Sequence, residues 1–318
     1  MGSIAAIDVG SHTARLLIAR EAPQPGAWEP VLRRRAYIRL AEDFLEPQKR
    51  WIKRSAIART LEALEEFAGC LKDWAVRETR AVATGVVRDA LNAEPFLALI
   101  AERTGIRVRV ISGEEEALLT GRGVLHALDA GPGALVIFDL GGGSTEFVFG
   151  RKGDLGVRSL PLGAMLLTRR YLGADPPEPG EIRRLVEHVD AVLREHFPPA
   201  GADLRGGWIA GTGGTVTTLA AMVHGIPVDG IRPDRMNGLG LGREELEEVL
   251  GLLSTRTLEE LLSLPGLDRG RADVIVAGTL AVLRILNCFG ATRMTVSLSD
   301  LLDGLLIDDG GGNESNGI

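Results

Sequence analysis

The pattern of apolar and polar positions divides the first half of the chain into short apolar runs and longer amphipathic stretches. The short runs are rich in Val, Ile and Leu and are bounded by turn residues, as expected for strands. From about 53 to 75, apolar residues recur every three to four positions, which predicts a helix. In order, we expect strands at 3–10, 13–20 and 30–40, the helix at 53–75, a strand at 79–85, a helix at 88–105 closing on Gly105, a strand at 106–113 and a helix at 114–128.

The same order of elements then recurs. We expect strands at 133–140, 145–151 and 155–163, helices up to about 197, a strand at 206–211, helices opening at about 212, 243 and 271, and a strand at 292–298. Asp8 and Asp139 each end an apolar run, lie 131 positions apart, and place Thr13 in register with Ser144. A repeat of whole units predicts two α/β domains. We place them at 1–126 and 127–299, with a last helix at about 300–307 packing back on the first domain and a disordered tail at 308–318.

Composition and charge exclude several classes of protein. The chain of 318 residues has a net charge of −7, whereas broad nucleic-acid binding requires a basic surface. No apolar run approaches the roughly 20 residues of a membrane-spanning helix, and the N-terminus does not resemble a signal peptide. Cys70 and Cys288 form no metal or redox spacing and suit a reducing compartment. We therefore expect a cytoplasmic protein that binds neither nucleic acid nor membrane.

Three glycine-rich loops follow predicted strands. Glycine lets a backbone approach a ligand closely, consecutive N–H groups form an anion-binding nest, and hydroxyls add donors. The third loop precedes a helix, whose N-terminus also favours phosphate. One such loop alone also fits an ordinary hairpin turn, but two in register on repeated units, facing across a cleft, could grip a chain of phosphates. The predicted phosphate-binding residues are Gly10, Ser11, His12 and Thr13, then Gly141, Gly142, Gly143, Ser144 and Thr145, and finally Gly213, Gly214 and Thr215.

Carboxylates near these loops suggest a metal ion. An Asp at the end of a strand, as at Asp8 and Asp139, can hold Mg²⁺ directly or through water. Glu146 lies just past the second loop, at a position of its strand where an apolar or neutral residue is expected. We interpret it as a further metal ligand.

Two other charged residues have both a structural and a chemical interpretation. Ser112 and Glu115 fit a capping box, in which each side chain bonds the other's backbone N–H. Glu116 is not needed for that cap and could orient or deprotonate a water, although local sequence alone favours a solvated acidic helix end. Arg88 could contact phosphate, or it could pair with Asp89.

At these residues the chain resembles a known family. The stretches "AAIDVGSHTARLLIAR", "VATGVVRDALNAEPFL", "VISGEEEALL", "VIFDLGGGSTEFVFG", "SLPLGAMLLTRRYL", "GTGGTVTTLAAM" and "RADVIVAG" occur in the order seen in exopolyphosphatases and guanosine pentaphosphate phosphohydrolases. This is the Ppx/GppA family of the actin, sugar-kinase and Hsp70 superfamily. The resemblance runs from residue 4 to about 306 and fits the short form without additional C-terminal helical domains.

The resemblance implies a fold, a reaction and partners. The fold would be two ribonuclease-H-like (actin-like ATPase) domains with a cleft between them. The reaction would be hydrolysis of a terminal phosphoanhydride of inorganic polyphosphate or guanosine pentaphosphate, with Mg²⁺ or Mn²⁺ as cofactor and a homodimer as the expected assembly. The family's proposed base, the glutamate before the alanine of "EEA", is Glu116 here. Asp139 and Glu146 carry over as metal-side carboxylates and Arg88 as a phosphate contact.

Three positions depart from the family pattern. His12 replaces the usual Asn, Leu118 replaces an Arg common after "EEA", and Leu302 stands where Arg is expected. The two lost charges would weaken polyanion binding or shift the preferred substrate length. Three alternatives therefore stay open: an ATP-dependent phosphotransferase on the same fold, a nucleotide-binding scaffold like actin-type filament proteins, and a non-catalytic sensor of polyphosphate or guanosine pentaphosphate.

Overall fold

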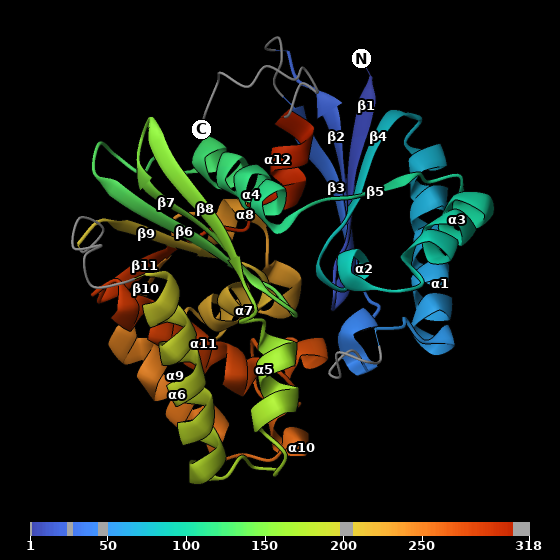
Figure 1. Cartoon of the computed structure of the whole chain (residues 1–318). Helices are drawn as coiled ribbons and strands as arrows, with labels where there is room; N and C mark the ends of the chain where they lie inside the picture. The colour runs from blue at the N-terminus through green and yellow to red at the C-terminus, as the bar shows by residue number, and fades with distance from the viewer. Residues whose placement is uncertain (1, 24–27, 44–49, 198–205, 308–318) are drawn as a thin grey trace. The chain divides into compact units, whose positions relative to one another are not determined.

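The computed structural model describes residues 2–23, 28–43, 50–197 and 206–307, so the predicted tail at 308–318 lies outside the described residues. The described chain divides into two compact units (Figure 1). Unit 1 runs to Gly123 and resumes at Leu301, and unit 2 runs from Val124 to Asp300. Each unit is an α/β structure built on one sheet.

The sheet of unit 1 has five strands in the order β3-β2-β1-β4-β5. β1, β2 and β3 pair antiparallel as consecutive hairpins, whereas β4 and β5 join parallel to β1. This order and these directions are those of a ribonuclease-H-like sheet. The strands are β1 (Ser3–Val9), β2 (Thr13–Glu21), β3 (Trp28–Tyr37), β4 (Val76–Ala83) and β5 (Val108–Val110).

Helices cover both faces of this sheet. Side chains alternate along β1, so Ile4 and Ala6 face a cluster that includes Leu119 and α12, the last helix of the described residues. α1 packs on β2, β3 and β4 and lies beside α3 (Figure 1). α3 ends where Gly105 adopts a left-handed conformation at φ +74°, as predicted. The helical elements are η1 (Leu40–Asp43), α1 (Arg54–Asp73), α2 (Gly85–Asp89), α3 (Ala93–Thr104), α4 (Gly113–Ala127), which continues into unit 2, and α12 (Leu301–Ile307).

The sheet of unit 2 repeats the same order. Its strands run in the order β10-β11-β9-β6-β7-β8. Strands β8, β7, β6, β9 and β11 correspond to β3, β2, β1, β4 and β5 of unit 1, and β10 is an additional edge strand. β6, β7 and β8 are antiparallel neighbours, and β9 and β11 join in parallel. The predicted pair of ribonuclease-H-like units is therefore confirmed. The strands are β6 (Ala134–Leu140), β7 (Thr145–Arg151), β8 (Asp154–Leu160), β9 (Trp208–Thr212), β10 (Gly240–Gly242) and β11 (Arg293–Val296).

The helices of unit 2 gather around α11, which is buried on nearly all sides and packs against α5, α6, α7 and α9 (Figure 1). Thr215 of α7 approaches Gly278 of α11 so closely that a Cβ on Gly278 would lie 2.6 Å from the threonine methyl. The helical elements are α5 (Ala164–Tyr171), α6 (Pro179–His196), α7 (Gly214–Val223), η3 (Val228–Gly230), α8 (Pro233–Met236), α9 (Arg243–Ser254), α10 (Leu258–Leu261), η4 (Arg269–Arg271) and α11 (Ile275–Cys288).

Local differences from the sequence prediction have simple causes. The expected helix at 88–105 is two helices, because the backbone leaves the helical conformation at Ala90, and Asn92 then bonds the main chain of Ile52. The strand β10 was missed because it is only three residues long and two of them are glycine. The helix expected from Arg271 begins at Ile275, after a short 3₁₀ turn.

The last helix completes the core of unit 1. Leu301, Leu302, Leu305 and Leu306 of α12 pack with residues of β1, β2 and β4. Arg80 of β4 donates to the carbonyl oxygens at the end of α12. In the described part of the chain, no helix combines the length and the apolar character needed to cross a bilayer.

Candidate active site

The glycine loop of unit 1 is a two-residue hairpin between β1 and β2. The N–H of Gly10 donates to the carbonyl of Thr13 at 3.0 Å and closes the turn. The carbonyl of Ser11 accepts from Ala41, and that of His12 accepts from Ile38, each at 3.0 Å. A trans peptide places C=O and the following N–H on opposite sides. The N–H of His12 therefore points away from the segment that holds the carbonyl of Ser11.

The glycine loop of unit 2 has the same construction. The N–H of Gly141 donates to the carbonyl of Ser144 at 3.0 Å, which repeats the turn of unit 1 at positions 131 residues later. N–H groups at the start of α5 hold the carbonyls of the loop: Ala164 bonds Gly141 at 2.9 Å and Met165 bonds Gly142 at 3.0 Å. The N–H groups that follow these carbonyls belong to Gly142 and Gly143 and point away from α5. Neither donates a hydrogen bond in the described part of the chain. Such a row of N–H groups is suited to an anion.

Some hydroxyls of the predicted loops have partners inside their own unit. The hydroxyl of Ser11 accepts from the N–H of Val86 in α2 at 3.3 Å. The hydroxyl of Thr145 is fully buried and donates to the carbonyl of Leu162 at 3.0 Å. His12 is also buried, and its ring meets the edge of Tyr37 at 5.3 Å between centroids. These side chains hold the loops in shape, and the backbone is the better candidate for binding phosphate.

Two carboxylates lie side by side at the end of β6. Asp139 and Glu146 are direct partners in the β6–β7 register, so their side chains project on the same face of the sheet. Asp139 is 7% exposed and Glu146 is 3% exposed. Ser159 of β8 donates to Glu146 Oε1 at 2.7 Å. Two buried carboxylates at neighbouring positions repel each other unless a cation or a proton compensates them.

The equivalent pair in unit 1 has opposite charges. Asp8 and Arg15 are partners in the β1–β2 register, at positions 131 residues before Asp139 and Glu146. Arg15 donates to Asp8 Oδ2 from Nε at 2.9 Å and from the terminal nitrogen at 2.8 Å. The predicted metal ligand Asp8 is therefore already neutralised by a cation of its own unit.

The donor set of unit 2 fits a magnesium ion. Among residues 2–23, 28–43, 50–197 and 206–307, no three His, Cys, Asp or Glu side chains gather as a complete metal cage would require. Mg²⁺ does not need such a cage, because it keeps several waters and is usually held by one or two carboxylates together with substrate phosphates. The two oxygen-donor side chains at Asp139 and Glu146 meet that description.

The predicted base and the predicted arginine lie together in unit 1. Glu116 is in the first turn of α4 and is 8% exposed. The Arg88 guanidinium lies 3.9 Å from Glu116 Oε2 and also donates to the carbonyl of Ile111 at 3.1 Å. Half of the predicted capping box is present, because the Ser112 hydroxyl accepts from the N–H of Glu115 at 3.1 Å, while the Glu115 carboxylate pairs with Arg109.

The third glycine loop lies against the carboxylate pair. Gly213 has φ of +93°, and a Cβ there would lie 2.7 Å from Asp139 Oδ1. Next to it, a Cβ on Gly214 would lie 1.7 Å from the guanidinium carbon of Arg271, which is 7% exposed. Thr215 is fully buried in the first turn of α7. The structure thus brings the third loop and the end of β6 together.

Arg271 is the residue that sequence reasoning missed. It begins the stretch "RADVIVAG", which carries the family resemblance, yet nothing in its local sequence separates it from a surface arginine. Buried arginines are rare unless they are paired or bind an anion. Only the fold brings it against the glycine loop of α7.

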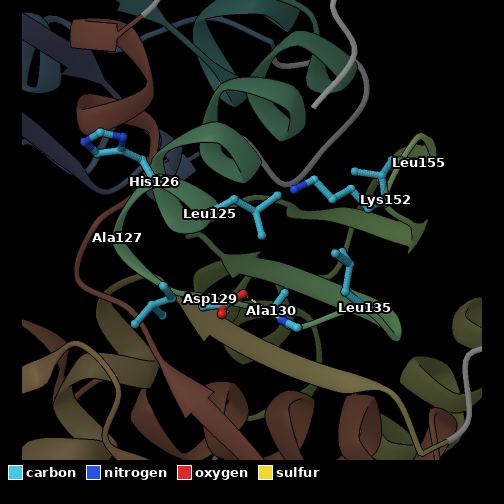
Figure 2. A pocket seen from close by; sticks show the side chains of 10 residues that line it. Leu125, His126, Ala127, Asp129, Ala130, Leu135, Lys152 and Leu155 are labelled. Atoms are coloured by element: carbon cyan, nitrogen blue, oxygen red, sulfur yellow. Dashed lines mark hydrogen bonds between the residues drawn. The ribbon is translucent and has the colours of Figure 1, made fainter. Parts of the chain in front are cut away.

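A separate pocket of about 430 Å³ lies in unit 2 and contains none of the predicted site residues. Figure 2 shows Leu125 and Leu135 in its lining, with Lys152 extending toward Leu125. The pocket adjoins the start of β6, whereas Asp139 is near the end of that strand. The predicted chemistry therefore lies elsewhere in the unit.

Comparison with known proteins gives the family. The model of the Ppx/GppA phosphatase family matches residues 17–311. Exopolyphosphatase 2 of Mycobacterium tuberculosis is 34% identical, over 96% of this chain and 97% of its own length. A crystal structure of the Aquifex aeolicus Ppx/GppA family member is 30% identical with a TM-score of 0.80 and covers 97% of both chains. An exopolyphosphatase structure from Cytophaga hutchinsonii is 26% identical with a TM-score of 0.86, over 95% of this chain and 96% of that one.

The chain belongs to the Ppx/GppA phosphatase family and is a phosphoanhydride hydrolase. The resemblance drawn from the sequence motifs is thereby confirmed. The roles of the individual site residues and of a metal ion remain predictions.

Proposed function

We propose that this protein is an exopolyphosphatase, which releases orthophosphate from the end of inorganic polyphosphate by attack of a water molecule. Relatives named exopolyphosphatase that are 30–34% identical over nearly the whole chain support this substrate. Guanosine pentaphosphate carries the same terminal phosphoanhydride and is the second substrate that we propose.

The observation that carries the proposal is the position of Glu116. Its carboxylate is nearly buried in the first turn of α4, and a guanidinium lies 3.9 Å away. A carboxylate held in this way can orient a water and accept its proton as the water attacks phosphorus. In our proposal Arg88, at its side, contacts an oxygen of the phosphate under attack.

The backbone of the loops supplies the binding of phosphate. The N–H groups of Gly142 and Gly143 have their preceding carbonyls tied to α5, so they are oriented before any substrate arrives. Fixed donors of this kind stabilise charge on transferring oxygens without reorganising during the reaction. The loop at Ser11 and His12 has the same design and the same role in our proposal.

Asp139 and Glu146 are the residues that would hold Mg²⁺ or Mn²⁺. When bound, the ion supplies charge neutralisation for the phosphate oxygens. Asp8 has a different role in this proposal: through its ion pair it positions Arg15 next to the loop of unit 1.

Phosphate release is the experiment that tests the function. Purified protein with Mg²⁺ is offered tripolyphosphate, long-chain polyphosphate, guanosine pentaphosphate and ATP, with Glu116→Gln as the control. We expect release from polyphosphate and a loss of about 100-fold or more in the variant, which keeps the shape and removes the base. Wild-type turnover by the variant would refute the role of Glu116. Tight polyphosphate binding without release would favour the sensor, and consumption of ATP only with an added acceptor would favour the phosphotransferase.

The assembly is part of the same proposal. We propose a homodimer, as the family resemblance implies, and a location in the cytoplasm, as the composition suggests. Light scattering on the full chain, coupled to size-exclusion chromatography, tests it directly, and a monomer at assay concentration would overturn this part without affecting the proposed chemistry.

A further inference from the structure

Basic and aromatic side chains gather on α5 and α6 of unit 2. The guanidinium of Arg170 lies over the ring of Tyr171, 5.6 Å from its centroid. The rings of Tyr171 and His188 lie 5.1 Å apart at an angle of 33°. Arg170 is exposed, while Tyr171 and His188 are half-buried. The Arg170 guanidinium, which is charged, and the His188 imidazole, which can be protonated, therefore both lie near the ring of Tyr171.

The next basic residue on α6 lies outside this cluster. Arg184 precedes His188 by one helical turn, but its guanidinium reaches back toward Gly180, where a Cβ would lie 3.6 Å from it, and its charge helps to lower the pKa of Glu181. In the described part of the chain, Arg170 and His188 form no ion pair within 4 Å. The positive charge of Arg170 is therefore available to a ligand.

The protonation of His188 responds to the same surroundings. Burial, and then the Arg170 guanidinium, lower the pKa of His188 below its usual value. The groups that face it are Arg170 and Tyr171 from α5. On α11, the other helix packed against α6, Arg284 is paired with Asp190. An anion placed among these groups would remove the repulsion that disfavours the imidazolium.

The position of the cluster relates it to the glycine loop of unit 2. The first turn of α5 holds the loop carbonyls through Ala164 and Met165, and Arg170 is six residues further along the same helix. That separation is about 9 Å along the axis. We infer that a long chain of phosphates with its end in the loop extends to the cluster, whereas tripolyphosphate occupies the loop alone.

We propose that Arg170, Tyr171 and His188 form a second contact for the phosphate chain, at a distance from the reacting end. The inference rests on the proposed function, because it assigns the cluster to the same substrate. The cluster binds distal phosphates and so sets a preference for long chains. Because the bound chain favours the protonated His188, long-chain binding takes up a proton and is tighter at pH 6 than at pH 8.

Charge reversal at Arg170 tests this contact. Arg170→Glu is expected to raise the KM for long-chain polyphosphate about tenfold, the effect of losing one charge-assisted contact. Turnover of tripolyphosphate is expected to stay within twofold of wild type. Arg183→Glu is the matched control, because it makes the same charge change about 140° around α6 from His188. An unchanged KM for long chains in Arg170→Glu, or an equal rise in Arg183→Glu, would overturn the proposal.

A binding experiment separates this inference from the function itself. In a Glu116→Gln background, affinity for long-chain polyphosphate is measured at pH 6 and pH 8, with and without Arg170→Glu or His188→Gln. We expect Arg170→Glu to weaken binding about tenfold at pH 6, and His188→Gln to remove most of the difference between the two pH values. Binding that depends on Arg170 supports the contact even if no hydrolysis is found. Affinity that is unchanged by both substitutions refutes the contact even if hydrolysis is fast.

Discussion

Asp139 and Glu146 are cross-strand partners with both carboxylates buried, whereas the residues 131 positions earlier, Asp8 and Arg15, form an ion pair. The same hairpin therefore places an arginine beside the aspartate in unit 1 and a second carboxylate beside it in unit 2. A cation that binds at the two carboxylates would stabilise unit 2, which makes the carboxylate pair testable without an assay of turnover.

The first prediction concerns that cation. Mg²⁺ at 100 times its dissociation constant should stabilise the wild-type protein by about 2.7 kcal/mol, because it binds the folded state alone. Asp139→Asn and Glu146→Gln should each abolish most of this gain, since each replaces a charged oxygen ligand by a neutral amide. Thermal unfolding with and without Mg²⁺ measures both effects. Ser159→Ala, which removes only the hydroxyl that donates to Glu146, should retain the response to Mg²⁺.

The second prediction concerns the support of the glycine loop. Gly163→Ala should reduce turnover by about 100-fold, the cost of misplacing a binding group by an ångström. Gly163 has an ordinary φ of −72°, so the effect is purely steric: the new Cβ would lie 2.3 Å from the carbonyl oxygen of Gly142. Steady-state kinetics with polyphosphate provides the measurement.

Gly251→Ala is the matched control for that variant. Gly251 lies within α9, and no atom lies within 4 Å of the added Cβ. It should leave turnover unchanged and should stabilise the protein by up to about 1 kcal/mol, because alanine is the better helix former. Equal losses of activity in both variants would contradict the steric argument.

The third prediction separates the two positions at which the family pattern has arginine. Leu302 is 3% exposed in the core of unit 1, so Leu302→Arg should destabilise the protein by several kcal/mol or prevent folding. Leu118 is 37% exposed, and Leu118→Arg should change stability by less than about 0.5 kcal/mol. Urea unfolding distinguishes the two. If Leu302→Arg folded normally and bound polyphosphate more tightly, our account of this position would be wrong.

The fourth prediction concerns the pH dependence of stability at the start of α6. Hydrogen bonds from the N–H groups of Glu178 and Gly173 lower the pKa of Glu181 below its usual value. A carboxyl whose pKa is lower in the folded state stabilises the protein above its unfolded pKa, and this contribution is lost as the pH falls through the folded value. Glu181→Gln should therefore be less stable than wild type at pH 7, and the two proteins should converge as the pH falls below about 4.3, the unfolded value of a glutamate.

Urea unfolding of both proteins across this pH range measures the convergence. Glu187, also on α6, is exposed and has no part in the cap, so Glu187→Gln is the control and should follow wild type throughout. A difference between Glu181→Gln and wild type that did not shrink on acidification would contradict the assignment of the lowered pKa to the cap.

Much of the fold could be predicted because the chain repeats itself. The spacing of Asp8 and Asp139, each at the end of an apolar run, indicates two copies of one unit, and the observed sheets have the same strand order. The short strand β10 could not be predicted, since its glycine-rich sequence has no strand propensity and only pairing with β11 makes it a strand.

The sequence predicted which residues belong to the candidate site better than it predicted what each of them contacts. Glycines and carboxylates after apolar strands predicted Asp139 and Glu146, whereas the family resemblance was needed to predict Glu116. Neither signal showed that Asp8 pairs with Arg15, although cross-strand register would have indicated this once the hairpin was drawn. Arg271 could not be predicted from the sequence, because it lies against Gly214, a residue far from it along the chain.

The core of unit 1 also has a consequence for the synthesis of the chain. Its first 123 residues leave the ribosome early, yet the leucines of α12 that complete its core belong to residues 301–306. Unit 2 is one continuous segment, 124–300, and is complete before α12 is made. The unit that begins first must therefore wait for the last helix to be translated, and nascent chains that stop short of it would expose the apolar face of β1 to chaperones.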